Sequence, residues 1–224
     1  MGYRLENKEI DLFNRRTSKI STSKSGDIYK YRGQAIKVYP NNIDFNEVLD
    51  ENTARYLTGI TTDRILLPRK LLFYNRNFVG YSLKLVDKKG SNGRIINAPV
   101  NDVIFNIELL EEDIDLLSSK GILLNGITPN NVIYNGDIYL TDPSRYAVMD
   151  GGDTRYLNRL NQYQLHLLIS ELIVSDIRKD NFRNSTVSNM RELFSLKDDN
   201  ERCGEFFEEL FEGNKSIKQF VKKQ

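Results

Sequence analysis

The apolar residues of this chain of 224 residues change their periodicity near residue 90, and that change limits the folds open to it. Before this point, short β-rich runs alternate with turn residues; they cover residues 28–31, 34–39, 71–74 and 78–86. After it, apolar residues recur at steps of three and four, as on one helical face; they include Ile107, Leu110, Ile114 and Leu117. We therefore predict an α+β protein with a β-rich N-terminal lobe, residues 1–87, and a mainly helical C-terminal lobe, residues 88–224.

Three pairs of strand-like runs are separated by residues that favour tight turns. The connecting residues are Arg32-Gly33, Asn75-Arg76-Asn77 and, within the helical lobe, Asn135-Gly136. The last of these joins residues 132–134 to residues 138–140 and is the pair preferred in a type I′ turn. We expect three hairpins, one of them embedded among helices. Residues 21–27, rich in serine, are interpreted as a flexible polar turn.

One helix is expected in the N-terminal lobe, at residues 44–57. Asp44 can cap its first turn, Glu47 follows at capping-box spacing, and Gly59 can end it. Polar residues 88–92 are interpreted as a linker. In the C-terminal lobe Lys120-Gly121 is predicted to end the first long helix. Two later apolar stripes are predicted to face the core; they are Leu165, Leu168, Ile169 and Leu172, then Phe206, Phe207, Leu210 and Phe211.

Composition excludes several classes of protein. Lys and Arg together number 32 and Asp and Glu 31, so no overall field draws the chain to nucleic acid or to anionic lipid. No apolar stretch approaches the roughly 20 residues of a membrane span. The single Cys203 forms no internal disulfide, which fits a reducing compartment. We expect a cytoplasmic protein that binds neither nucleic acid nor a membrane.

A strand-like run, Ala35-Ile36-Lys37-Val38, contains a lysine suited to binding phosphate. A lysine on a strand offers a fixed positive charge, provided that an acidic group holds its flexible stem. Glu51 is the expected partner, and Glu47, one helical turn earlier, is the alternative.

A second run of interest is Leu-Asn-Gly-Ile-Thr-Pro-Asn-Asn at residues 124–131, followed by the predicted hairpin and by Asp142. Asn131 and Asp142 offer oxygen atoms, the ligands that Mg²⁺ prefers. Gly126 stands five residues before Asn131. The alternative to a metal site is that residues 129–131 form an ordinary turn and that Asp142 only ends a strand.

Taken in order, these segments resemble the protein kinase family. Residues 161–172 add a further similarity, because they resemble the central helix of the kinase C-lobe, with Asn161 in place of its Asp. The resemblance implies a two-lobe kinase-like fold that binds ATP and Mg²⁺. It implies that the nucleotide is contacted by Lys37, Glu51, Gly26, Ala35, Leu83 and Leu85, and the metal by Asn131 and Asp142. The only histidine, His166, is predicted to be a packed or surface residue rather than a catalytic one.

The departures from the family pattern concern catalysis. Gly126 occupies the position of the catalytic Asp, so no catalytic residue is assigned; Asp150 and Asp153 are nearby carboxylates that nothing in the sequence places. The metal turn is Asp142-Pro143-Ser144 instead of Asp-Phe-Gly, and only Gly26 represents the glycine-rich loop. The leading hypothesis is a pseudokinase that acts through a protein partner. The alternatives are an active phosphotransferase or nucleotidyltransferase, and an interaction module whose nucleotide site is filled by its own side chains.

Overall fold

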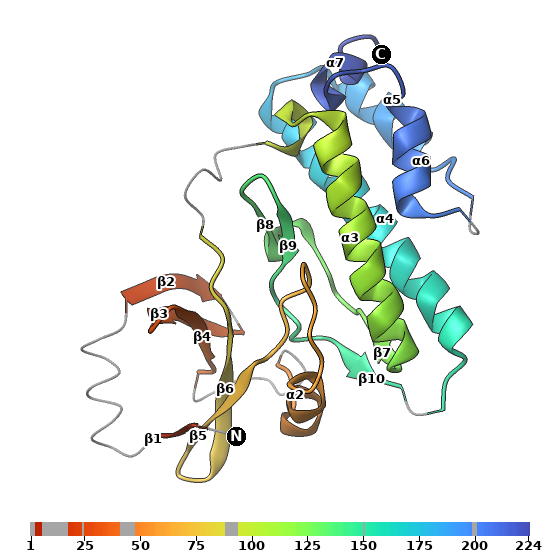
Figure 1. Cartoon of the computed structure of the whole chain (residues 1–224). Coiled ribbons are helices and arrows are strands. Elements are labelled where there is room, and N and C mark those ends of the chain that lie inside the picture. The colour runs from red at the N-terminus through yellow and green to blue at the C-terminus, as the bar shows by residue number, and fades with distance from the viewer. Residues whose placement is uncertain are drawn as a thin grey trace. The chain divides into compact units, whose positions relative to one another are not determined.

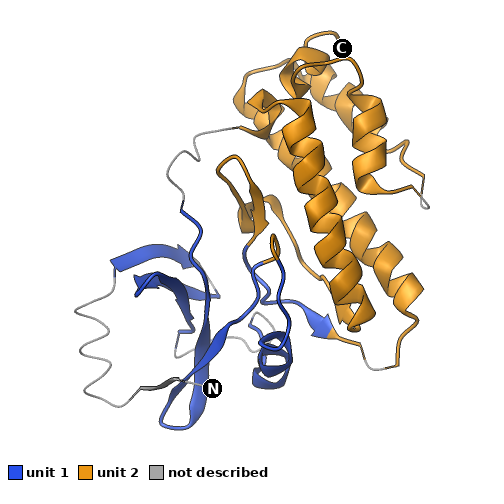
Figure 2. Cartoon of the chain, in the orientation of Figure 1, with its two compact units in different colours: residues 1–62, 66–87, 141–147 blue, residues 63–65, 88–140, 148–224 orange. Residues whose placement is uncertain are grey.

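A computed structural model describes most of the chain and has the predicted α+β composition (Figure 1). The residues described are 3–5, 18–23, 25–40, 48–87, 94–149, 151–198 and 201–224. They form two compact units (Figure 2): unit 1 comprises residues 1–62, 66–87 and 141–147, and unit 2 comprises residues 63–65, 88–140 and 148–224. Each unit is described in turn.

Unit 1 is built on a six-stranded sheet with the strand order β1-β5-β6-β4-β3-β2. The strands are β1 Tyr3–Leu5, β2 Ser18–Ser23, β3 Gly26–Tyr31, β4 Gln34–Val38, β5 Lys70–Tyr74 and β6 Asn77–Lys84. β1 pairs in parallel with β5, and the other pairings are antiparallel. Part of the predicted polar turn at residues 21–27 is instead strand, because β2 pairs with β3.

The two hairpins predicted in this unit are confirmed, and both have two-residue turns. Arg32 and Gly33 have φ of +48° and +74°, and Asn75 and Arg76 have φ of +48° and +68°. Positive φ at both central residues is the signature of a type I′ turn, whose twist matches that of the flanking strands. Asn77, predicted to lie in the turn, is the first residue of β6 and pairs with Tyr74.

The strand register gives the sheet two different faces. Lys37 lies opposite Ile28 of β3 and Tyr81 of β6, so these three side chains share one face. The other face carries a hydrophobic cluster made by Ile36, Leu72, Tyr29, Tyr31, Val38 and Val79. A lysine therefore occupies a position in the middle of the sheet where an apolar residue is usual.

The helix found among the described residues of unit 1, α2 (Glu51–Leu57), is shorter than predicted. Its cap is Asp50, whose carboxylate accepts hydrogen bonds from the amides of Asn52 and Thr53. Residues 48–50 are not helical, so the prediction of a helix over residues 44–57 is wrong at these three positions. The predicted capping residues Asp44 and Glu47, like the linker at residues 88–92, lie outside the described residues.

Unit 2 is mainly helical. Its helices are α3 Val100–Ser119, α4 Thr154–Lys179, α5 Asn184–Phe194, α6 Cys203–Leu210 and α7 Ile217–Val221, with 3₁₀ turns η2 Ile95–Asn97 and η3 Pro129–Asn131. The four residues predicted for the core face of α3 have no exposed surface. The helix ends at Lys120, and Gly121 has φ +71°, as predicted for a left-handed cap. Among the described residues, no helix has the length and apolar character needed to span a bilayer.

Short strands complete the molecule. β8 (Val132–Tyr134) and β9 (Ile138–Leu140) form the predicted hairpin, and β7 (Ile122–Leu123) pairs with β10 (Ala147–Val148). The pairing of Tyr134 with Ile138 leaves three loop residues, and only Gly136 has positive φ, at +104°. The predicted two-residue type I′ turn is therefore wrong, because Asp137 also belongs to the loop.

Candidate functional site

Lys37 is the centre of a polar cluster inside unit 1. Its residue is 1% exposed, and its ammonium group is surrounded by oxygen atoms. Nζ donates to Asp142 Oδ1 at 2.8 Å and Oδ2 at 2.9 Å, to Ser144 Oγ at 2.7 Å and to Ser25 Oγ at 2.9 Å. We call these four residues, Lys37, Asp142, Ser144 and Ser25, the Lys37 cluster. Ser25 lies 12 residues before Lys37, whereas Asp142 lies 105 residues after it.

The carboxylate of this cluster is fixed by its own turn. The Ser144 amide donates to Asp142 Oδ1 at 3.1 Å, and the Ser144 hydroxyl donates to the same oxygen. The amide of Tyr146 donates to the Pro143 carbonyl at 3.0 Å, which closes a turn over residues 143–146. Short-range bonds of this kind are typical of Asp followed by a turn. Asp142 thus presents both oxygens to Lys37.

Burial and charge act in opposite directions on the two ionised groups. Burial lowers the pKa of Lys37, and the adjacent Asp142 carboxylate offsets only part of that effect. Burial raises the pKa of Asp142, but the Lys37 charge and the Ser144 hydrogen bonds outweigh it and hold the pKa below its usual range. The Lys37 nitrogen and the nearer Asp142 oxygen lie 2.8 Å apart, which is the geometry of a salt bridge.

Two tyrosines border the cluster. Tyr81 is fully buried and lies opposite Lys37 in the sheet, and its ring meets that of Tyr39 edge-on at 6.0 Å. The Tyr39 hydroxyl donates to the Leu49 carbonyl at 3.1 Å. Burial raises the pKa of both phenols well above the usual value, and the negative charge of Asp142 adds to the effect. Both tyrosines therefore stay neutral.

The expected pairing of Lys37 with Glu51 is wrong. Glu51 is half-buried, opens α2 and pairs with Arg55 one turn later at 2.6 Å. Its carboxylate thus serves its own helix, while Lys37 is held by Asp142. Glu47, the alternative partner, lies outside the described residues.

Other residues predicted to contact the nucleotide have identifiable structural roles. Gly26 has φ +136°, and a Cβ atom there would lie 2.5 Å from the Val38 carbonyl oxygen, so the close approach of β3 to β4 requires glycine. Ala35 and Leu83 are buried, lie opposite each other and share the sheet face of Lys37. Leu85 is half-buried just beyond β6. Ala35 and Leu83 therefore lie on the same side of the sheet as the Lys37 cluster.

The remaining predicted residues belong to unit 2. Gly126 has φ +69°, a conformation that few side chains tolerate. Asn131 Oδ1 accepts from the Thr128 amide at 3.0 Å and from the Thr128 hydroxyl at 2.7 Å. The oxygen predicted to bind metal therefore already holds the loop that carries it. Asp153 caps α4 by accepting from the amide of Arg155 at 2.9 Å, and Asp150 lies outside the described residues.

Two polar residues of α4 serve packing. Asn161 is fully buried; it accepts from the Leu124 amide at 2.8 Å and donates to the Ile122 carbonyl at 2.8 Å and to Ser118 Oγ at 2.9 Å. His166 is 5% exposed and its Nε2 lies 2.8 Å from the Phe194 carbonyl oxygen. It stacks on the ring of Phe207 at 5.5 Å, which confirms the prediction of a packed histidine.

Sequence reasoning did not identify Ser25 and Ser144 as partners of Lys37. Ser144 could have been found, because it follows Asp142 in the position of a turn-forming residue. Ser25 gives no comparable signal among the several serines of residues 21–27.

The chemistry of the cluster suits phosphate and Mg²⁺, although its groups satisfy one another in this structure. Asp142 supplies oxygen donors and Lys37 a phosphate-binding cation. Among the described residues no three His, Cys, Asp or Glu side chains gather as a ready metal site. No family model matches the chain, and no curated protein is found to be similar to it.

Proposed function

We propose that the protein is a kinase-like pseudokinase that binds ATP with Mg²⁺ through Lys37 and Asp142 and acts through a protein partner. The observation that carries the proposal is the Lys37–Asp142 pair, with 2.8 Å between cation and carboxylate at a buried position of the sheet. Phosphoryl groups need a fixed cation, and their magnesium needs oxygen ligands.

Binding has to break the internal pair. The phosphates would replace Asp142 as the partner of Lys37, and the magnesium would take the carboxylate that is released. The apparent affinity is then the intrinsic affinity multiplied by the fraction of molecules in which the pair is open. We therefore expect a lower nucleotide affinity than for a site whose lysine is already free.

Catalysis is expected to be impaired because Gly126 has no side chain with which to accept a proton. A positioned acid or base typically contributes about 10²–10⁴ in rate. Asp153, a nearby carboxylate, is engaged as the cap of α4. Trace phosphoryl transfer is compatible with this proposal, since positioning and charge stabilisation supply much of that chemistry.

A second candidate function is supported by the same contacts. All four hydrogen bonds of Lys37 go to side chains of the chain itself. If this arrangement is permanent, the protein is an interaction module that binds no nucleotide.

Thermal unfolding with ATP, in the presence and absence of Mg²⁺, distinguishes the candidates. At a ligand concentration of 100 Kd, one site adds about 2.7 kcal/mol to the free energy of unfolding. We expect a magnesium-dependent rise in Tm for the native chain and for Lys30→Ala, an exposed lysine of β3. We expect none for Lys37→Ala, each variant being compared with its own ligand-free Tm.

Two results would replace the proposal. No shift at millimolar ATP in the native chain would favour the interaction module. Transfer of labelled phosphate well above a trace, and lost in Asp142→Asn, would indicate an active transferase.

A further inference from the structure

Helix α4 of unit 2 carries an apolar stripe on its outer face. Tyr156, Leu160, Tyr163 and Leu167 follow one another at steps of four, three and four, so they lie on one line along the helix. Tyr156 is 62% exposed, Tyr163 52% and Leu167 41%, and Leu160 is half-buried. The core of unit 2 is contacted by a different face of α4, which includes Leu165 and Leu168. The stripe is therefore separate from the core.

The same line continues into the second half of α4, where it is covered. Ser170 and Val174 are the next residues at this spacing, and they are 8% and 1% exposed. Helix α5 packs against α4, and Figure 1 shows it near the C-terminal half of that helix. In the part of the chain that the structure describes, no helix plays the same role for the N-terminal half. The N-terminal half of this line of α4 residues is thus mostly exposed, while its C-terminal half is buried.

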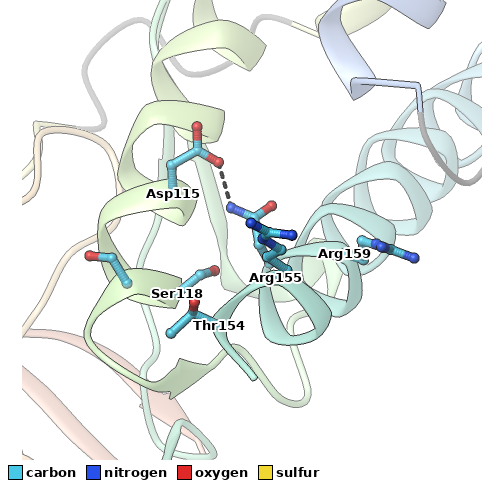
Figure 3. Close-up of a pocket in the computed structure, with 7 residues that line it drawn as sticks. Asp115, Ser118, Thr154, Arg155 and Arg159 are labelled. Atoms are coloured by element: carbon cyan, nitrogen blue, oxygen red, sulfur yellow. Dashed lines mark hydrogen bonds between the residues drawn. The ribbon is translucent and has the colours of Figure 1, made fainter. Parts of the chain in front are cut away.

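Positive charge borders the open half. Residues 154–170 contain Arg155 and Arg159 and no acidic residue. Both arginines are exposed and form no ion pair with another described residue. They line a shallow pocket of about 410 Å³ together with Asp115 (Figure 3). Asp115 is already bonded to Arg202 at 3.1 Å and to Asn158 at 2.8 Å, so its charge is engaged elsewhere.

We infer that this surface, Tyr156, Leu160, Tyr163 and Leu167 with Arg155 and Arg159, docks an amphipathic acidic helix of a protein partner. Apolar residues at steps of three and four accept the side chains of a second helix. The arginines select for carboxylates beside that apolar seam. A second copy of α4 fits less well, because its own residues 154–170 supply no carboxylate.

The inference gives a location to the partner that the proposed function requires, but the two can fail separately. Every residue of the docking surface belongs to unit 2, whereas Lys37 and Asp142 belong to unit 1. The ATP measurement above and the peptide measurement below therefore test different residues.

The test uses the full chain and a fluorescent helical peptide of about three heptads with leucine at the core positions and glutamate at the flanking ones. A matched peptide carries lysine in place of each glutamate. In anisotropy titrations we expect the acidic peptide to bind more tightly than the basic one, with an affinity that falls as salt is added. Tyr163→Ala and Leu167→Ala should each weaken binding by about 30-fold, as for the central residues of an interface.

Charge reversal supplies the decisive variant. Arg155→Glu with Arg159→Glu should reverse the preference, so that the basic peptide binds more tightly. Phe105→Ala, which removes an aromatic residue that is 56% exposed on α3, is the matched control and should leave binding unchanged. Circular dichroism verifies that each variant is folded.

Three results of the binding measurements would overturn the inference. They are equal binding of the two peptides, loss of binding in Phe105→Ala to the same extent as in Tyr163→Ala, and tighter binding of single-stranded RNA than of the acidic peptide. Sedimentation that detects a dimer lost in Tyr163→Glu would also overturn it, in favour of a second copy as the occupant.

Discussion

The buried polar residues of the two units differ in what they bind. In unit 1 all four hydrogen bonds of Lys37 go to side chains. In unit 2 the buried acids Glu111 and Asp113 and the amide Asn161 bind backbone N–H groups. Asp113 accepts from the amides of Asp63, Arg64 and Ile65, Glu111 from those of Cys203 and Gly204, and Asn161 from that of Leu124.

This difference separates structural polar groups from groups available for function. A buried backbone amide needs a hydrogen-bond acceptor. If the side chain that accepts from it moves away, the amide is left unpaired and the fold is destabilised. A lysine held only by side chains can exchange them for phosphate, because the ligand supplies oxygen atoms of the same kind. The comparison therefore distinguishes Lys37, whose partners are exchangeable, from Asp113, whose partners belong to the backbone. It predicts different responses to substitution.

The largest effect is expected at Asp113. Its carboxylate accepts from Asp63 N at 3.1 Å, Arg64 N at 2.7 Å and Ile65 N at 2.8 Å. Asp113→Ala leaves these donors without their acceptor, and each unsatisfied buried group costs about 1–3 kcal/mol. We expect a loss of about 4 kcal/mol in the free energy of unfolding, measured by urea denaturation.

Glu112→Ala is the control for this prediction, since Glu112 is an exposed neighbour on the same helix. It should change stability by less than about 0.5 kcal/mol. If Asp113→Ala were equally mild, water would have to satisfy the three amides, and the structural role assigned to Asp113 would be withdrawn.

A smaller but more informative effect is expected at Lys37. Lys37→Met leaves the Asp142 carboxylate in a largely buried position without its cation. Removing one partner of a buried pair costs about 3–5 kcal/mol, and we expect the lower end, about 3 kcal/mol, because the Asp142 side chain is 23% exposed.

The double variant Lys37→Met with Asp142→Leu sharpens the comparison. With both charges replaced by apolar groups, most of the lost stability should return, because a buried ion pair is often no better than a hydrophobic contact. Chemical denaturation of the two single variants and the double variant gives the coupling energy. Additive losses would mean that the two side chains are not energetically coupled, and would remove the pair on which the proposed function depends.

Local signals were sufficient to predict most elements of the fold. The turn at Arg32-Gly33 and the core stripe of α3 depend on residues close together in the sequence, and both are as expected. The start of α2 was misplaced because Asp44 and Asp50 are both good caps, and local sequence does not rank them. The loop at Asn135-Gly136 was misjudged because a two-residue and a three-residue loop share this dipeptide.

Long-range partners were the harder problem. Asp142 is separated by 105 residues from Lys37, and the sequence alone favoured the nearer Glu51. The charge and size of the two acids are similar, so only the tertiary structure decides between them. The glycine at position 26 was assigned to phosphate binding, whereas the clash of a Cβ atom with Val38 gives a structural reason for it. That reason depends on the spacing of two strands, which composition does not reveal.

The smallest effect concerns the pH dependence of unit 2. Burial lowers the pKa of His166, Lys197 lowers it further, and the bond to the Phe194 carbonyl raises it only in part. In the unfolded chain its pKa is about 6.5. Below about pH 6.5 His166 is therefore protonated in the unfolded chain but still neutral in the folded chain. The free energy of unfolding then decreases as the pH falls towards the lower pKa of the folded state. Above this window both states are neutral, and His166 contributes no pH dependence.

His166→Gln tests this by removing the titrating group. Urea denaturation at about pH 7.5, 6 and 5 should give a steeper loss of stability for the native chain than for the variant. For one proton the difference in slope cannot exceed about 1.4 kcal/mol per pH unit. Parallel slopes would show that His166 is protonated in the folded state. Unit 2 would then contain a buried side chain that changes its charge with pH. The contrast between purely structural buried polar groups in unit 2 and the exchangeable Lys37 cluster in unit 1 would no longer hold.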